Sequence, residues 1–379
     1  MKFGTKAVHA GVEPDPSTGA IMTPIFQTST YVQESPGRHT GYEYSRTQNP
    51  TRDALQNNLA ALENAAHGLV FGSGLAATDA ILKLLKPGDE VLASNDIYGG
   101  TYRMFTQIYQ DFGIKFKFVD MRDLNRISEH FTGNIKMVWA ETPSNPMMNI
   151  IDIKGLAGVC KKFGAMFCVD NTFATPYLQN PLDLGAELVL HSVTKYLSGH
   201  SDVVMGCLMT SNPQLHEKLA FIQNSSGAIA GPMDCFLALR GIKTLHIRMQ
   251  RHCENGRRIA HFLKAHPKVD KVYWPGFEEH VNHDIAKKQM RDFGGMISFI
   301  LKNDKIDHAI KVMENLKLFA LAESLGGVES LCGHPASMTH AAIPRAERIA
   351  AGLKDSLIRL SVGIEDPEDL ISDLEKALG

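Results

Sequence analysis

The chain has 379 residues, of which 44% are hydrophobic and 21% are charged, and its formal net charge is −2. These values are typical of a globular protein that is long enough for two domains. The near-neutral charge provides no basic surface for nucleic acid or anionic lipid, and no apolar run is long enough to span a membrane. The six cysteines form no CxxC pair, so we expect neither a zinc site nor a disulfide framework. The first residues lack the apolar core of a signal peptide, which favours a cytoplasmic protein.

Residues 1–47 are rich in Thr, Ser, Pro and Gly and show little periodicity, so we expect an extended arm. From about residue 50, short apolar runs alternate with stretches of helical spacing. This alternation predicts a mostly parallel sheet that is covered by helices on both faces. The expected strands are 68–72, 90–94, 116–120, 137–140, 166–170 and 188–191, and a helix over 75–85 is expected to stop at Lys86-Pro87-Gly88.

After about residue 245 the expected strands become sparser, at 296–301 and 357–362, and helical patterns dominate. We therefore expect a large α/β domain over 48–245 and a smaller α+β domain over 246–379. The pairs Arg248/Arg251 and Arg257/Arg258 are interpreted as solvated helix faces. A last helix is expected to begin at Pro367 with Asp366 as its cap.

Polar residues follow several of the expected strands, at the strand ends where parallel sheets gather reactive groups. Residues 189–200, VLHSVTKYLSGH, carry Lys195 just past an apolar run, although lysine is normally a surface residue. Asp170 ends another run, and Phe71-Gly72-Ser73-Gly74 leads a third run into the helix that begins near Leu75. Small residues there let backbone N–H groups approach an anion. Each feature alone is equally typical of a turn or a helix cap.

Together, these three features are the parts that a pyridoxal phosphate enzyme needs. In such an enzyme a lysine forms a Schiff base with the cofactor, an aspartate pairs with the pyridinium nitrogen, and a helix start holds the phosphate. Ser192 and Thr194 offer hydroxyls to the same phosphate. Burial and the cofactor's positive charge are expected to lower the pKa of Lys195, which keeps part of the amine neutral. The sequence therefore predicts that Lys195 is reactive.

Nine motifs, in order along nearly the whole chain, resemble those of the Cys/Met-metabolism family of pyridoxal phosphate enzymes, which has fold type I. They are TGYEYSRTQNPT (40–51), FGSGLAA (71–77), YGGTYR (98–103), ETPSNP (141–146), VDNTFATP (169–176), HSVTKYLSGHSD (191–202), AESLGGVESL (322–331), MTH (338–340) and LIRLSVGIED (357–366). The ordered set is far more specific than any one motif.

The resemblance implies a role for each matching residue. Lys195 resembles the cofactor-binding lysine that also moves protons between substrate carbons, and Asp170 resembles the partner of the pyridinium nitrogen. Tyr98 resembles the aromatic residue that stacks on the cofactor ring and can act as an acid or a base. The phosphate is implied to bind the backbone of Gly74 and Leu75, together with Ser192 and Thr194.

Three further parts of the site follow from the same resemblance. Arg359 resembles the clamp on the substrate α-carboxylate, which Ser324 and Asn145 support. Tyr44 and Arg46 resemble residues that reach the phosphate in the neighbouring subunit. The resemblance therefore implies a homotetramer, a dimer of dimers, with active sites that subunits share.

Two positions bear on the substrate. Gly100 stands where methionine γ-lyases carry a cysteine, and Glu323 matches an acidic residue of the enzymes that handle cystathionine. A carboxylate at position 323 suits the distal ammonium of cystathionine. We therefore expect γ-elimination of L-cystathionine to L-cysteine, 2-oxobutanoate and ammonia. The cystathionine γ-synthase reaction, which joins an O-acyl-L-homoserine to L-cysteine, remains open, whereas cystathionine β-lyase and methionine γ-lyase activity are less favoured. A cofactor-free α/β binding module is the alternative outside the family.

Overall fold

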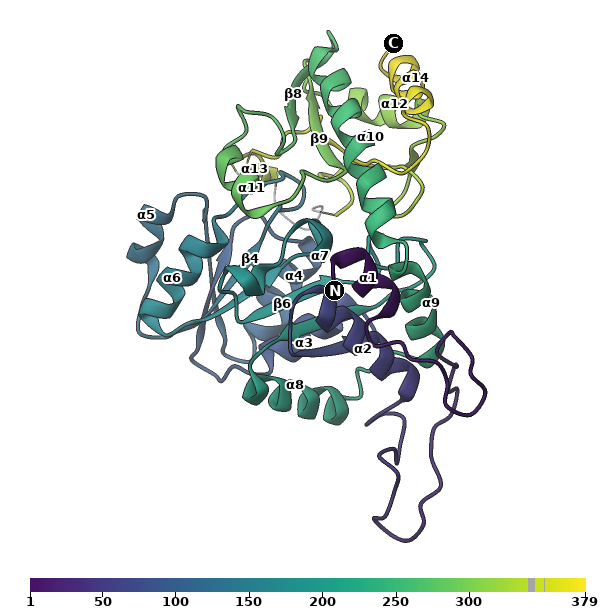
Figure 1. Cartoon of the computed structure of the whole chain (residues 1–379). Coiled ribbons are helices and arrows are strands. Elements are labelled where there is room, and N and C mark those ends of the chain that lie inside the picture. Colours follow the sequence, from purple (N-terminus) through teal and green to yellow (C-terminus); the bar gives the residue numbers. More distant parts are fainter. Residues whose placement is uncertain (340–344, 351) are drawn as a thin grey trace.

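The computed structural model describes residues 1–339, 345–350 and 352–379 and is shown in Figure 1. Within these residues the chain forms a seven-stranded sheet and a five-stranded sheet, each covered by helices. The seven-stranded sheet has the order β1-β7-β6-β5-β4-β2-β3. The pairs that join β1 to β7 and β7 to β6 are antiparallel, and the remaining pairs are parallel. Its strands are β1 (His67–Phe71), β2 (Glu90–Ser94), β3 (Lys115–Val119), β4 (Ile135–Glu141), β5 (Met166–Asp170), β6 (Leu188–Ser192) and β7 (Gly206–Thr210).

The central strands of this sheet are apolar on both faces because helices cover both of them. In β4, Met137 and Trp139 join one buried cluster, whereas Val138 and Ala140 join another. This period of two is the geometry of a strand whose successive side chains point to opposite faces.

The helices that accompany the large sheet are α1 (Phe3–His9), α2 (Pro50–Leu62), α3 (Gly74–Leu82), α4 (Gly99–Met104), α5 (Leu124–Ile127), α6 (Ile153–Phe163), α7 (Thr175–Leu178), α8 (Pro213–Ser226) and α9 (Pro232–Ile242).

The smaller sheet has the order β10-β11-β12-β9-β8 and is antiparallel except between β10 and β11. Its strands are β8 (Val269–Tyr273), β9 (Met296–Leu301), β10 (Ala320–Leu321), β11 (Leu331–Gly333) and β12 (Ile358–Ser361). The associated helices are α10 (Leu245–Ala265), α11 (His283–Gln289), α12 (Ile306–Asn315), α13 (Arg345–Ala350) and α14 (Pro367–Leu378). A third apolar cluster lies between β9, β12 and the helices α10, α12 and α14.

The expected mostly parallel sheet is confirmed, and β2, β5 and β9 have the predicted bounds. Strands β7, β8, β10 and β11 were not predicted. The edge strand β8 is hard to recognise because Asp270 and Lys271 are exposed and interrupt its apolar pattern. The predicted domain boundary after residue 245 falls at the start of α10. The first half of this helix joins the apolar cluster of the large sheet, and its second half joins that of the small sheet.

The chain before residue 50 is mostly extended, and it projects from the body as the purple loops in Figure 1. Its first residues differ from the expectation, because Phe3–His9 form α1 and Ala7 is buried in the core beside α2. Asp366 precedes α14 as expected, but its side chain makes no cap hydrogen bond and instead pairs with Arg251 at 3.3 Å. Among the described residues, no helix has the length and apolar character needed to cross a membrane.

Candidate active site

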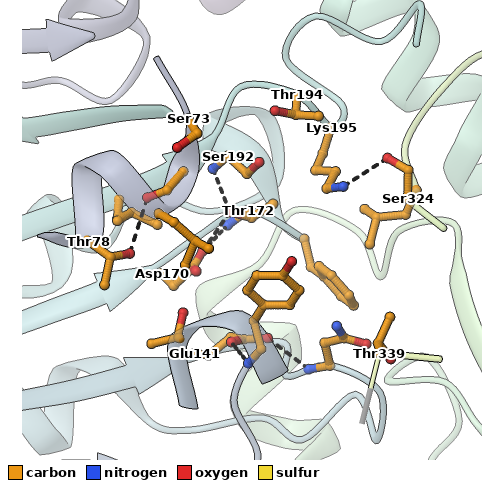
Figure 2. Close-up of a pocket in the computed structure, with 18 of the residues that line it drawn as sticks. Ser73, Thr78, Glu141, Asp170, Thr172, Ser192, Thr194, Lys195, Ser324 and Thr339 are labelled. Atoms are coloured by element: carbon orange, nitrogen blue, oxygen red, sulfur yellow. Dashed lines mark hydrogen bonds between the residues drawn. The ribbon is translucent and has the colours of Figure 1, made fainter. Parts of the chain in front are cut away.

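A cavity of about 350 Å³ lies at the carboxyl ends of β4, β5 and β6. Arg359 of β12 and the segment after β10 close it on one side. Figure 2 shows Lys195 and Asp170 beside this cavity, with Ser324 facing the lysine. The predicted residues that line it are Gly74, Leu75, Tyr98, Asn145, Asp170, Ser192, Thr194, Lys195, Glu323, Ser324 and Arg359. With Thr339 of the MTH motif, the structure therefore brings residues from eight of the nine motifs together in one pocket.

Lys195 lies in the turn that follows β6, and its Nζ donates a hydrogen bond to Ser324 Oγ at 2.8 Å. Burial lowers the pKa of Lys195 from 10.5 to about 8, and the positive charge of Arg359 acts in the same direction. The carboxylate of Glu323 opposes this shift. With such a pKa, roughly a tenth of the amine is neutral at pH 7, which is the form that attacks a carbonyl carbon.

The turn that carries Lys195 is held by a buried guanidinium on α10. Arg248, only 4% exposed, donates from Nη1 to Tyr196 O at 2.7 Å and from Nη2 to Leu197 O at 3.3 Å. Gly199 has φ +73°, and a side chain there would overlap this guanidinium. The interpretation of Arg248 as part of a solvated face is therefore wrong. Arg248 Nη2 also donates to Gly241 O at 2.9 Å, but its two partners in the Lys195 turn lie about 50 residues away in the sequence, so no local pattern reveals them.

Asp170 ends β5, and a neighbouring threonine that the sequence analysis did not single out orients its carboxylate. Thr172 donates to Asp170 Oδ1 from its backbone N at 3.0 Å and from its Oγ1 at 2.6 Å. The same Oγ1 accepts from Ser192 N at 2.9 Å, which links the ends of β5 and β6. Burial raises the pKa of Asp170, so a cation beside it would stabilise its charged form. The position of Thr172, two residues after Asp170, is the signal that identifies it.

The start of α3 forms a small cradle. Ser73 caps the helix, because its Oγ accepts from Ala76 N at 3.0 Å. Gly74 faces Ser192, and a Cβ at Gly74 would lie 3.3 Å from Ser192 Cβ and 3.4 Å from Ser192 Oγ. The absence of this Cβ keeps the backbone N–H groups open to the cavity, as an anion site at a helix start requires. Thr194 Oγ1 is close by in the chain, although in this structure it bonds Met205 O at 3.2 Å.

Arg359 reaches the cavity from β12, and its side chain is almost completely buried. Its Nη1 donates to Asn145 Oδ1 at 2.9 Å and its Nη2 to Ser324 O at 2.8 Å. Burial lowers the pKa of Arg359 to about 10, so the group is still charged at neutral pH. Ser324, with φ +118°, is strained, and this conformation lets its hydroxyl meet Lys195 while its carbonyl meets Arg359.

Two predicted residues lie where the cavity is more exposed. Tyr98 is 40% exposed and precedes α4, and a side chain at Gly100 would overlap its ring. Glu323 is exposed and sits beside Ser324, and its charge acts on both Lys195 and Arg359.

Tyr44 and Arg46 do not line this cavity. They lie on the arm, where the Arg46 guanidinium is 5.2 Å from the centre of the Tyr44 ring and Arg46 Nε donates to Asn224 Oδ1 at 3.2 Å. His340, the last residue of the MTH motif, lies outside the described residues. The cavity also contacts residues that the sequence analysis did not assign to the site, including Ser73, Glu141, Phe173 and Thr339.

The chemistry of the lining fits pyridoxal phosphate. The cavity offers a buried amine of lowered pKa, a buried carboxylate at the adjacent strand end, and a helix start that a glycine leaves open. Within the described part of the chain, no group of His, Cys, Asp and Glu side chains has the arrangement of a metal site, and all six cysteines are free and buried. The fold and this site define a pyridoxal-phosphate-dependent enzyme of fold type I.

The chain belongs to the family described as Cys/Met metabolism PLP-dependent enzymes, whose model matches residues 4–379. It is 53% identical over 378 residues to a cystathionine gamma-lyase of Dictyostelium discoideum, covering 100% of this chain and 97% of that protein. It is 54% identical over 376 residues to a cystathionine beta-lyase of Coxiella burnetii, covering 99% of this chain and 97% of that protein. The expected family, its cofactor and the class of carbon–sulfur lyases are therefore confirmed.

Solved structures agree closely in fold. The crystal structure of metB from Corynebacterium glutamicum superimposes with a TM-score of 0.97 at 46% identity. Cystathionine gamma-lyase from Lactobacillus plantarum, complexed with L-serine, gives 0.97 at 45% identity. Each comparison covers 100% of this chain and 98% of the other.

Proposed function

We propose that the chain cleaves L-cystathionine by γ-elimination and releases L-cysteine, 2-oxobutanoate and ammonia. The observation that carries this proposal is that one cavity holds a buried cation, Arg359, and a carboxylate, Glu323, with the Lys195 amine in the same pocket. An amino acid with an α-carboxylate and a second ammonium at its far end matches this pair of charges. The neutral thioether end of methionine would leave Glu323 without a partner.

Seven of the lining residues would hold the cofactor: Lys195 at the aldehyde, Asp170 at the ring nitrogen, Tyr98 at the ring face, and Gly74, Leu75, Ser192 and Thr194 at the phosphate. When bound, pyridoxal phosphate supplies an electron sink next to the substrate's α-carbon. Arg359 binds the substrate carboxylate through its planar fork. Glu323 attracts the distal ammonium.

The Lys195 amine moves the protons. Its lowered pKa leaves a neutral fraction that accepts the proton from the α-carbon. Once it has given this proton up to the bound cofactor, the amine is neutral again and accepts a proton from the β-carbon. Ser324 Oγ accepts a hydrogen bond from Nζ and so aims the amine into the cavity. The phenol of Tyr98 lies on the open side of the site and donates a proton to the departing sulfur.

Cystathionine β-lyase activity is the second candidate, because a relative at 54% identity carries that name. The β-reaction breaks the other carbon–sulfur bond of the same substrate, so the same pair of charges accommodates it. The cystathionine γ-synthase reaction also remains open, since in that reaction cysteine adds to the γ-carbon, whereas in γ-elimination the γ-carbon takes up a proton and water releases the nitrogen as ammonia. The choice among these reactions depends on the substrate carbons at which Lys195 and Tyr98 transfer protons, and one side chain rarely determines this.

The assembly is part of the same proposal. Tyr44 and Arg46 lie outside the cavity of their own chain, on an arm that projects from the body. We propose that they complete the phosphate site of a neighbouring subunit in a dimer, and that two such dimers form a tetramer. A cytoplasmic location stays a prediction from the sequence.

Product analysis tests the activity. With L-cystathionine alone, γ-elimination gives 2-oxobutanoate and cysteine, whereas β-elimination gives pyruvate and homocysteine. Cystathionine formed from an O-acyl-L-homoserine and cysteine, with no oxoacid from cystathionine alone, would overturn the lyase proposal in favour of the synthase. An excess of pyruvate over 2-oxobutanoate would overturn the γ-elimination assignment.

A further inference from the structure

We propose that Glu141 is a positioning residue that fixes two walls of the active site at once. It is 4% exposed, ends β4 and lines the cavity. Figure 2 shows its carboxylate at the edge of the pocket with hydrogen bonds to two separate backbone segments. In this proposal Glu141 does not bind the substrate itself and acts only by holding these two segments in place.

Each carboxylate oxygen of Glu141 holds a different segment. Oε2 accepts from the backbone N of Tyr98 at 2.7 Å, and Oε1 accepts from the backbone N of Asn145 at 2.9 Å. Tyr98 forms the wall at which the cofactor ring is proposed to stack. Asn145 continues to Arg359 through its Oδ1 at 2.9 Å. The buried side chain of Glu141 therefore positions Tyr98 directly and Arg359 through Asn145.

The electrostatic surroundings of Glu141 disfavour a charge at this position. Its strand neighbour is Asp170, and Asp96 also lies close enough to act on it. Burial and these two acids raise the pKa of Glu141, whereas the two N–H donors oppose the rise. A neutral apolar residue would avoid this cost. An apolar residue, however, could not accept hydrogen bonds from both loops, and the proposed role of Glu141 depends on this ability.

Replacing Glu141 with Gln isolates this property. The amide has nearly the same size, but only its oxygen accepts, so its NH₂ group faces one backbone N–H that then loses its acceptor. We expect Glu141→Gln to raise the KM for L-cystathionine about tenfold with a smaller change in kcat. We also expect a changed circular dichroism band of the bound cofactor, because the ring beside Tyr98 changes its orientation.

Asp373 provides a matched control. It is 7% exposed and accepts hydrogen bonds from the backbone N–H groups of Lys317 at 2.9 Å and Leu318 at 2.8 Å, but it does not line the cavity. Asp373→Asn removes the same kind of buried acceptor. It is expected to lower the melting temperature of the holoenzyme while KM and the cofactor signal stay within twofold of wild type.

A double variant tests the route to Arg359. If Glu141 acts on substrate binding through Asn145, then Glu141→Gln adds little to the KM defect of Asn145→Ala. A KM for Glu141→Gln within twofold of wild type, an unchanged cofactor band, or additive KM defects would each overturn the inference. This inference rests on the proposed function for its KM arm only. The cofactor band and the cofactor dissociation constant need no substrate, so they test Glu141 even if cystathionine proves not to be the substrate.

Discussion

The turn that carries Lys195 and the arm that carries Arg46 contrast in how they are held. The turn is buried, and Arg248, Ser324 and its own backbone hydrogen bonds fix it from several sides. The arm is exposed and anchored mainly at its root, where Arg52 Nη1 donates to Ser45 O at 2.7 Å and Nη2 to Arg46 O at 3.1 Å. The groups proposed for the chemistry thus lie within one chain, whereas the groups proposed for the partner's phosphate are presented outward from the base of the arm.

The strongest way to break this comparison is to remove the amine from the buried turn. Lys195→Ala should lower the rate of cystathionine cleavage by at least roughly a thousandfold, because none of the other described residues that line the cavity is a lysine. Borohydride treatment should attach the cofactor to residue 195 in the wild type and to no residue in the variant. Activity at a tenth of the wild-type level would contradict the assignment.

Mixing subunits tests the proposal that Arg46 on the arm serves the active site of a neighbouring subunit. Arg46→Ala and Lys195→Ala chains should each be weak or inactive alone. Random pairing in one oligomer should restore about a quarter of the wild-type activity, since half the dimers are mixed and one of their two sites is intact.

The control for this experiment mixes Arg46→Ala chains with chains that carry both substitutions, which builds no intact site. Mixed oligomers verified by mass that show only the activity of the separate variants would refute the shared site.

Loosening the buried turn without touching its lysine should have a smaller effect. Arg248→Met keeps the apolar stem but leaves the carbonyls of Tyr196 and Leu197 without their donor. We expect kcat to fall roughly 10- to 100-fold through misplacement of the amine, together with a lower melting temperature. Arg251→Met is the control, because Arg251 lies on the same helix but pairs only with surface acids, and it should change kcat less than twofold.

The pH dependence of cofactor uptake gives the smallest effect. Because the pKa of Lys195 is lowered to about 8, its neutral fraction rises about tenfold between pH 7 and pH 9. The rate at which the cofactor-free protein binds pyridoxal phosphate covalently should follow this rise with a midpoint near pH 8. A midpoint near 10.5, the value of an ordinary lysine, would show that burial does not tune the amine.

The residues that the sequence identified are those whose chemistry follows directly from their place after a strand. Asp170 ends one apolar run and Lys195 follows another, and both runs are predicted strands of one mostly parallel sheet, so their position at one sheet edge follows from the fold class. Arg248 could not be identified in this way, because its partners in the Lys195 turn are carbonyl groups remote in the sequence and its neighbour Arg251 is a surface residue. Glu141 ends a strand in the same manner, but its importance depends on a backbone N–H that lies 43 residues earlier. Residues that orient others through contacts remote in the sequence therefore become visible only in three dimensions.

Helix α10 has a consequence for how the molecule melts. Leu245 and Met249, in its first half, belong to the apolar cluster of the large sheet, and Ile259 and Leu263, in its second half, belong to that of the small sheet. If either apolar cluster unfolds, it exposes to solvent the half of α10 that it buries, while the other half stays packed in the other cluster. The two halves of the chain are therefore coupled in a single cooperative unit, and a protein cut before this helix would lose apolar packing from the half that it keeps.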